Sequence, residues 1–175
     1  PSTFLPVQAQ QAQTPIYLKA GILAPGQTDS VIAASVATIS GYAPGQRGYY
    51  IVQFQGPVEQ AWKDQITAAG AELLGYLPDY AFKVRMTPEQ AAQVGQLATV
   101  NWVGIFQPAY KLAPEVSAAA AAPRLLRVQI EQGVDISAAA ATIAQTGAQI
   151  LQQEGDLLLV AADSGQTNGI AQVLD

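Results

Sequence analysis

The pattern of apolar and polar positions divides residues 50–106 into short elements. The β-branched and aromatic run Tyr50–Phe54 predicts a strand, and Gly56 and Pro57 end it. A helix follows, because apolar residues then recur every three or four positions: Val58, Trp62, Ile66 and Ala69. Gly70 is placed to cap the C-terminal end of that helix. The region therefore begins with a strand and an amphipathic helix.

Four more elements complete this region. Leu73–Tyr76 and Tyr80–Met86 predict two strands, joined by a turn whose Pro and Asp residues favour a hairpin. Residues 87–90, Thr-Pro-Glu-Gln, form a capping box at the start of a second helix. Residues 101–106 predict a closing strand. The expected order is strand, helix, strand, strand, helix, strand.

The same order begins again after residue 123. Residues 128–130 correspond to 52–54 at an offset of 76, and residues 147–151 correspond to 70–74 at an offset of 77. The offset then returns to 76, so the second hairpin is expected to be one residue shorter: Phe82 and Val84 match Leu158 and Val160. The counterpart of the closing strand would fall at about residue 179, so the second copy is expected to lack it.

Composition shifts mark the boundaries of these copies. Residues 1–48 are rich in Pro and Gly, which interrupt regular elements, and predict an irregular leader packed on the first copy. Within the leader, Ile16–Leu23 favours a strand, and Ser30–Ile39 favours a strand or a helix. Residues 113–123 contain a five-alanine run between prolines, which predicts a linker.

These patterns together define an expected fold class. A β-α-β-β-α-β unit is the ferredoxin-like arrangement. We therefore expect an α+β fold of two tandem ferredoxin-like modules, at residues 49–112 and 124–175, the second without its last strand and the first preceded by the leader. Many functions share this scaffold, so the fold by itself assigns none.

Composition argues against catalysis. The chain has no His and no Cys, which removes the commonest general base, the thiolate nucleophile and most zinc ligands. Its carboxylates are scattered singly, without the spacing of a calcium loop, and it has no phosphate-binding glycine motif. We therefore expect a chain that is not an enzyme and uses no metal or cofactor.

Charge narrows the class of partner. Thirteen acidic and eight basic residues give a net charge of −5, whereas nucleic acids and anionic membranes attract a positive field. The sequence also has no apolar run of the roughly 18 residues needed to cross a bilayer. We expect neither a nucleic-acid nor a membrane partner.

Three segments carry a resemblance to a known family. They are YYIVQFQGP at residues 49–57, YLPDYAFKVRM at 76–86 and VGIFQPAYK at 103–111. Together they resemble the N-terminal pro-region, or propeptide, of secreted bacterial subtilisin-like serine proteases, over residues 49–112 and more loosely in the second copy. The Asp, His and Ser motifs of the protease itself are absent. The resemblance implies a secreted or extracellular protein whose partner is a subtilisin-like protease domain, in cis or in trans.

The resemblance also implies a mechanism. In that family the pro-region acts as an intramolecular chaperone and inhibitor: its sheet packs on the protease, and the tail after its last strand lies in the active-site cleft. By binding the native enzyme better than the unfolded chain, such a module stabilises a slow-folding protease. On this sequence the tail candidates are Tyr110, Lys111 and Leu112. The copy nearer an enzyme would be the second, so the resemblance leaves open which copy inhibits.

Strand alternation adds candidates on the sheet. If Tyr50, Val52 and Phe54 point to the helices, alternate residues share the other face. That face would carry Tyr49, Ile51, Lys83, Arg85, Trp102 and Phe106. An apolar and aromatic face of this kind needs a partner, which would be the leader, the second module, or a separate protease domain.

Two other functions fit the same pattern. Tandem ferredoxin-like modules also act as ACT-like regulatory domains, which bind small ligands such as amino acids at their interface. A secreted protein-interaction or adhesion module with a propeptide-like fold is the other alternative.

Overall fold

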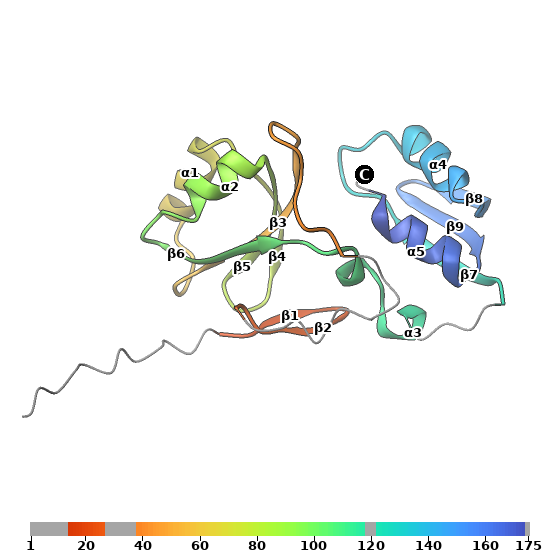
Figure 1. The fold of residues 1–175 in the computed structure, drawn as a ribbon, viewed down its shortest axis with the longest axis horizontal. Helices are drawn as coiled ribbons and strands as arrows, with labels where there is room; N and C mark the ends of the chain where they lie inside the picture. Colours follow the sequence, from red (N-terminus) through yellow and green to blue (C-terminus); the bar gives the residue numbers. More distant parts are fainter. Residues whose placement is uncertain (1–13, 27–37, 118–121, 174–175) are drawn as a thin grey trace, which may run out of the picture.

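The computed structural model describes residues 14–26, 38–117 and 122–173. They form a mixed α+β fold of antiparallel sheets and helices, arranged as two halves that lie side by side (Figure 1). The element expected at Ser30–Ile39 falls largely outside the described residues, and its described end, Thr38 and Ile39, belongs to no helix or strand.

The first half is built on a four-stranded antiparallel sheet in the order β4-β5-β3-β6. Its strands are β3 (Gly48–Phe54), β4 (Glu72–Leu77), β5 (Ala81–Met86) and β6 (Val100–Ile105). The helices α1 (Gln60–Ala68) and α2 (Pro88–Val94) lie on one face of this sheet (Figure 1). The order of elements is the one that the sequence predicts.

Alternation along β3 decides which side chains meet the helices. Tyr50, Val52 and Phe54 pack in one cluster with residues of α1 and α2, whereas Tyr49 and Ile51 belong to a second cluster on the opposite face. Every residue of β3 is buried, because both faces of the sheet are covered.

The leader covers the face opposite the helices. β1 (Ile16–Leu18) and β2 (Gly21–Leu23) pair as an antiparallel hairpin across that face (Figure 1). The single strand expected at Ile16–Leu23 is therefore split in two, and Gly21 supplies the positive φ of 144° where the second strand begins.

Short helices lie between the two halves. The 3-10 helix η1 (Pro108–Lys111) follows β6, and α3 (Pro114–Ser117) comes next. The segment expected to be a linker, 113–123, therefore begins with a helical turn. Pro114 stands at its first position, where a missing N–H removes no helical hydrogen bond. Residues 118–121 lie outside the described part of the chain.

The second half is built on a three-stranded antiparallel sheet in the order β7-β9-β8. Its elements are β7 (Arg124–Gln129), α4 (Ile136–Gln145), β8 (Gln149–Glu154), β9 (Leu157–Ala162) and α5 (Ser164–Gln172). Side chains of both helices pack against one face of this sheet to form its core.

Strand pairing in the second half repeats that of the first. β7 pairs with β9 in the register in which β3 pairs with β5, shifted by 76 residues: Tyr50 lies opposite Val84, and Leu126 opposite Val160. β8 pairs with β9 as β4 pairs with β5, and both pairs carry an irregularity at the corresponding place. The turn before β9 is one residue shorter than the turn before β5, as the offsets predict.

The helix ends repeat as well. Thr87 and Gln90 form a capping box at α2, and Asp163 and Gln166 form one at α5. Gly70 and Gly147, which follow α1 and α4, both have a φ of 88°, a conformation that favours glycine. Local sequence signals thus set the same element boundaries twice.

The hairpin makes a testable contribution to stability. We expect Ile16→Ala to destabilise the first half by about 2–5 kcal/mol, because Ile16 is fully buried against the sheet and truncation leaves a cavity. Ile22 is the matched control, since it lies in the same hairpin but is 52% exposed, and Ile22→Ala should cost less than about 1 kcal/mol. Urea unfolding followed by tryptophan fluorescence measures this, because both tryptophans are in the first half. Equal effects would contradict the packing.

Candidate functional site

The aromatic face predicted on the first sheet is covered by the chain itself. Tyr49 and Phe106 are 4% and 8% exposed, and Ile51 is fully buried. Ile16 and Leu23 of the leader hairpin belong to the same cluster, and Trp102 packs against it. The sequence grouped these residues on one face, and in this structure their partner is the leader.

The two basic residues of that face make ion pairs. Lys83 lies over the rings of Tyr49 and Phe106, 4.6 and 5.1 Å from their centroids, and its Nζ is hydrogen-bonded to Glu131 of the second half. Arg85 pairs with Glu72 at 2.8 Å, and this hydrogen bond raises the pKa of the guanidinium. Lys83 therefore links the two halves, whereas Arg85 acts within the first.

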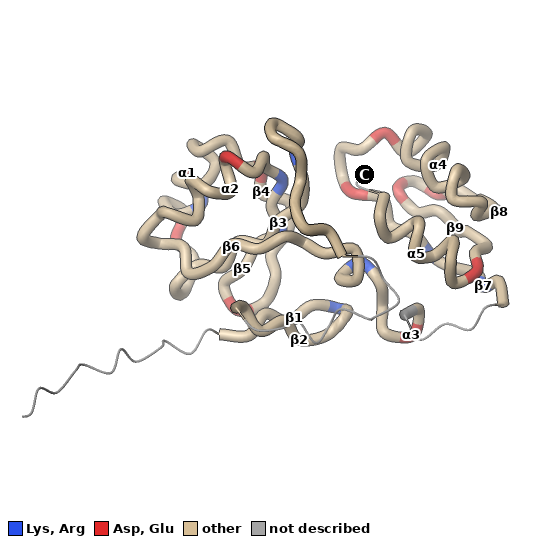
Figure 2. Tube along the Cα trace, viewed as in Figure 1, with Lys and Arg blue, Asp and Glu red and all other residues tan. Residues whose placement is uncertain are grey.

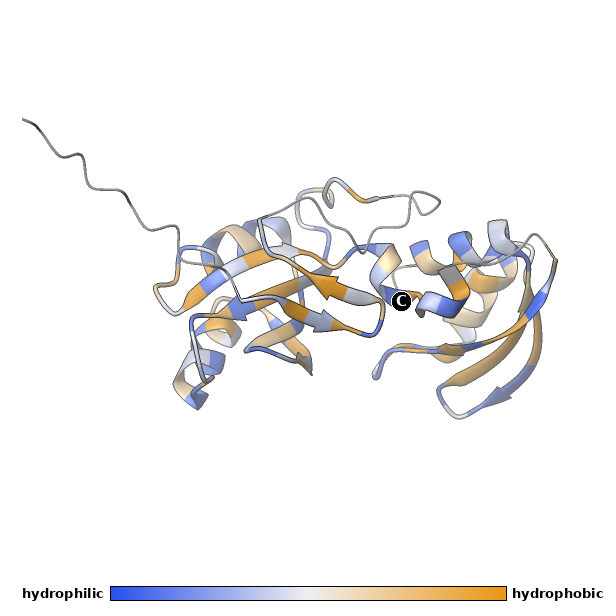
Figure 3. Ribbon diagram, turned by 90° about the horizontal axis from the view of Figure 1, so that it is seen from below, coloured by the Kyte–Doolittle hydropathy of each residue, from blue (hydrophilic) through white to orange (hydrophobic). Residues whose placement is uncertain are grey.

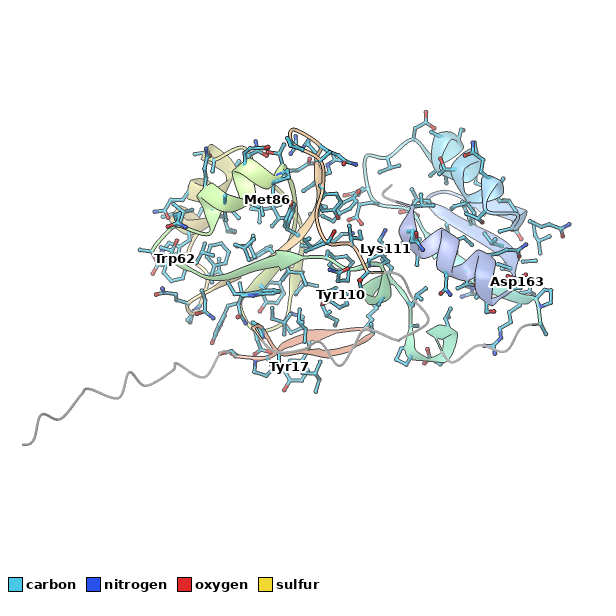
Figure 4. All side chains as sticks on the ribbon, viewed as in Figure 1. Tyr17, Trp62, Met86, Tyr110, Lys111 and Asp163 are labelled. Carbon is cyan, nitrogen blue, oxygen red and sulfur yellow. The ribbon has the colours of Figure 1, made fainter. Side chains whose placement is uncertain are left out.

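The predicted tail folds back between the halves. Tyr110 and Lys111 lie in η1, and Leu112 follows it. Tyr110 is 7% exposed and stacks edge-on with Phe106 at 5.5 Å, while Lys111 donates a hydrogen bond from Nζ to the carbonyl oxygen of Val173 (Figure 4). In this conformation the segment joins the two halves and is not an extended strand.

A cavity of about 580 Å³ lies between the halves, and the sequence did not predict it. One wall is β7 from Leu125 onward, and another is formed by α5 and η1. Four of the eight basic residues of the chain line it, Lys19, Lys83, Lys111 and Arg127, against one acidic residue, Glu131. Figure 2 shows basic positions on the hairpin and near η1, at the side of the first half that faces the second. The cavity is thus positive in a chain whose net charge is negative.

The outer face of the second sheet is a further surface that the sequence analysis missed. Leu125 and Leu151 are 66% and 53% exposed, and Leu157 and Leu159 are partly exposed beside them. Figure 3 shows the helices of the second half on one side of its strands, with no further element of the described chain drawn on the other. This apolar outer face corresponds to the hairpin-covered face of the first sheet.

The sequence did contain a signal for this outer face. Adding the offset of 76 to Tyr49 and Ala81 gives Leu125 and Leu157, so apolar residues recur at two of the positions that the hairpin buries in the first half, whereas Ile51 corresponds to Arg127. The sequence predicted that the leader packs on the first copy, but it did not show that the hairpin β1–β2 covers these positions there.

The described residues offer little for chemistry. They contain no group of three or more metal-ligating side chains, and every fully buried side-chain nitrogen or oxygen among them has a hydrogen-bond partner. Burial raises the pKa of Tyr42 and Tyr50, and a hydrogen bond with Thr87 lowers the pKa of Glu89 at the start of α2. These three groups lie in the first half and do not line the cavity.

Among the helices of residues 14–26, 38–117 and 122–173, none is both long and apolar enough to cross a bilayer.

Comparison with known protein families gives a match for the first half of the chain. A family described as a domain of unknown function, DUF8729, matches residues 16–107, which is more than half of the chain and includes the leader hairpin and the whole first sheet. Neither the curated proteins nor the solved structures gave a match.

The ion pair between Lys83 and Glu131 is expected to restrict the motion of the two halves relative to each other. We expect Lys83→Ala to broaden the distribution of distances between spin labels at Gln60 and Gln145, because it removes a hydrogen-bonded ion pair between the two halves. The chain has no native Cys, so labels can be attached at two introduced cysteines, and pulsed electron spin resonance measures the distance. Arg47→Ala is the control, since Arg47 pairs with Glu72 inside the first half. Unchanged width in Lys83→Ala would refute the link.

Proposed function

The chain belongs to the DUF8729 family, and we propose that it is the non-catalytic pro-region of a subtilisin-like serine protease, which it helps to fold and holds inactive. The proposal starts from the resemblance of residues 49–112 to such pro-regions. The observation that carries it is the apolar outer face of the second sheet, which the described chain leaves uncovered.

On this proposal the chain is two tandem ferredoxin-like modules. Supporting this, the second half repeats the strand registers, the helix caps and the glycine turns of the first at offsets of 76 and 77 residues. The modules differ in what covers their sheets. The first has its own hairpin and η1, whereas the second presents leucines at the matching positions.

The second module would therefore be the one that docks on the protease. Pro-regions of this kind place the sheet face opposite the helices on the enzyme, and here that face carries Leu125, Leu151, Leu157 and Leu159. Burying a leucine that is otherwise exposed contributes about 1.5–3 kcal/mol, so a patch of this size can favour the folded enzyme over its unfolded chain. The residues expected to dock from the first module, including Tyr49 and Phe106, would instead hold the leader.

The proposal also defines partner and location. The partner is a subtilisin-like protease domain, in cis or in trans, and both act outside the cell. The absence of His and Cys from the chain fits a role in which the enzyme supplies every reactive group. The tail of the first module, Tyr110–Leu112, would stay between the modules and not enter the cleft.

Inhibition of a protease by the folded chain tests the proposal. We expect the 175-residue chain to slow a broad-specificity subtilisin at micromolar concentration, and Leu151→Asp to raise the inhibition constant about tenfold or more. The reason is that the substitution replaces apolar contact with a desolvated carboxylate, and about 1.4 kcal/mol is a factor of ten. Initial rates of peptide hydrolysis measure the constant.

The control uses an equally exposed apolar residue elsewhere. Ile22 is 52% exposed, against 53% for Leu151, and lies on the outer side of the leader hairpin, so Ile22→Asp should leave inhibition unchanged. Circular dichroism of each variant checks that it is folded. If the folded wild-type chain does not inhibit, or if both variants lose inhibition equally, the proposed docking face is wrong.

A further inference from the structure

The edge of β7 that faces the cavity has the features of a second binding site. Within the described residues, β7 has one neighbouring strand, β9, so one row of its backbone groups has no strand beside it. Residues 125–130, which include all of β7 except Arg124, line the cavity between the halves. An unpaired strand edge of this kind is a template for another strand.

Alternation shows which backbone groups face the cavity. The N–H of Ile130 is bonded to the carbonyl of Asp156 at 2.8 Å, on the β9 side. In an antiparallel strand every second residue turns its N–H and C=O to the same side, so Leu125, Arg127 and Gln129 turn theirs away from β9. These groups form a continuous hydrogen-bonding edge along the cavity.

In the first half, the equivalent strand edge is occupied by another strand. There β3, the counterpart of β7, is paired on this edge with β6 in antiparallel register, with Ile51 opposite Gly104. The N–H of Phe106 donates to the carbonyl of Tyr49 at 2.9 Å. Tyr49 is the counterpart of Leu125, so its carbonyl faces the same edge of the strand as that of Leu125. Val103 and Ile105 of β6 pack toward the helices. The equivalent strand of the second half would lie in the cavity.

Charge indicates the chemistry of the occupant. Arg127 is the counterpart of Ile51. It is exposed in the cavity wall, and the residue opposite it on β9 is the uncharged Leu159. Lys19 also lines the cavity, where Lys83 is already paired with Glu131, so the remaining positive charge attracts carboxylates. Opposite charges directly across two strands stabilise their pairing.

We propose that the β7 edge binds an extended polypeptide segment with alternating apolar and acidic side chains, which adds as a fourth antiparallel strand. Its apolar residues face the core formed with α4 and α5, opposite Leu126 and Val128, and an acidic residue lies opposite Arg127. Main-chain hydrogen bonds to the edge give affinity, and the cross-strand charge gives register. This edge adjoins the apolar outer face of the sheet, since Leu125 belongs to that face and also lines the cavity.

The test uses a peptide copied from the strand that fills the equivalent place. The probe is a fluorescein-labelled peptide of residues 100–107 with Gly104→Glu, titrated with the 175-residue chain and followed by fluorescence anisotropy. We expect saturable one-to-one binding. Arg127→Glu in the protein should weaken it roughly three- to tenfold, and the same peptide with Gly104→Lys should regain that loss against the Arg127→Glu protein.

N-methylated peptides separate strand pairing from charge attraction. A methyl on the amide at position 104, which faces the edge, should abolish binding, whereas a methyl at position 103, which faces away, should leave it within a few-fold. Lys63→Glu, the same charge change on α1 and outside the cavity, should have no effect. The proposal is overturned if no binding occurs at millimolar concentration, if both methyl positions act equally, or if light scattering shows that the chain alone dimerises and that Arg127→Glu abolishes the dimer.

Discussion

Backbone hydrogen bonding along β3 and along its counterpart β7 is the constraint on which the two halves depend. β3 is paired on both edges, with β5 and β6, and all its residues are buried. β7 holds the same place in the second half, but within the described ranges it is paired on one edge only. A backbone N–H or C=O group needs a hydrogen-bond partner or water. The sheet of the first half therefore has no free edge at β3, whereas the sheet of the second half can accept a further strand at β7.

The same asymmetry appears in how the sheet faces are covered. In the first half, the leader hairpin and η1 bury the aromatic face, and Lys83 extends from its margin to Glu131 of the second half. In the second half, leucines at matching positions stay exposed. The proposed roles follow from this division: the first half anchors the leader and positions its neighbour, and the second offers a face and an edge for recognition.

Much of this arrangement could be predicted from the sequence because local signals set it. Strand alternation, the capping boxes at Thr87 and Asp163, and the glycines at 70 and 147 fix the element boundaries and the order of elements. The repeat could be found by offset alone. The leader was expected to form a strand at Ile16–Leu23 and to pack on the first copy. Its place on the sheet face opposite the helices and the cavity could not be predicted, since each depends on long-range contacts of residues such as Ile16 and Lys111. The residues of the candidate sheet face were grouped correctly. The sequence did not decide whether the leader, the second module or a separate protease domain covers that face.

The most direct measurement of the central claim is amide hydrogen exchange along the two equivalent strands. If β7 has a receptive outer edge, the amides of Arg127 and Gln129 exchange fast while those of Val128 and Ile130 are protected, and Ile51 and Gln53 of β3 are slow. Protection of Arg127 and Gln129 equal to that of Ile51 and Gln53 would contradict the account, because it would mean that a strand already occupies that edge.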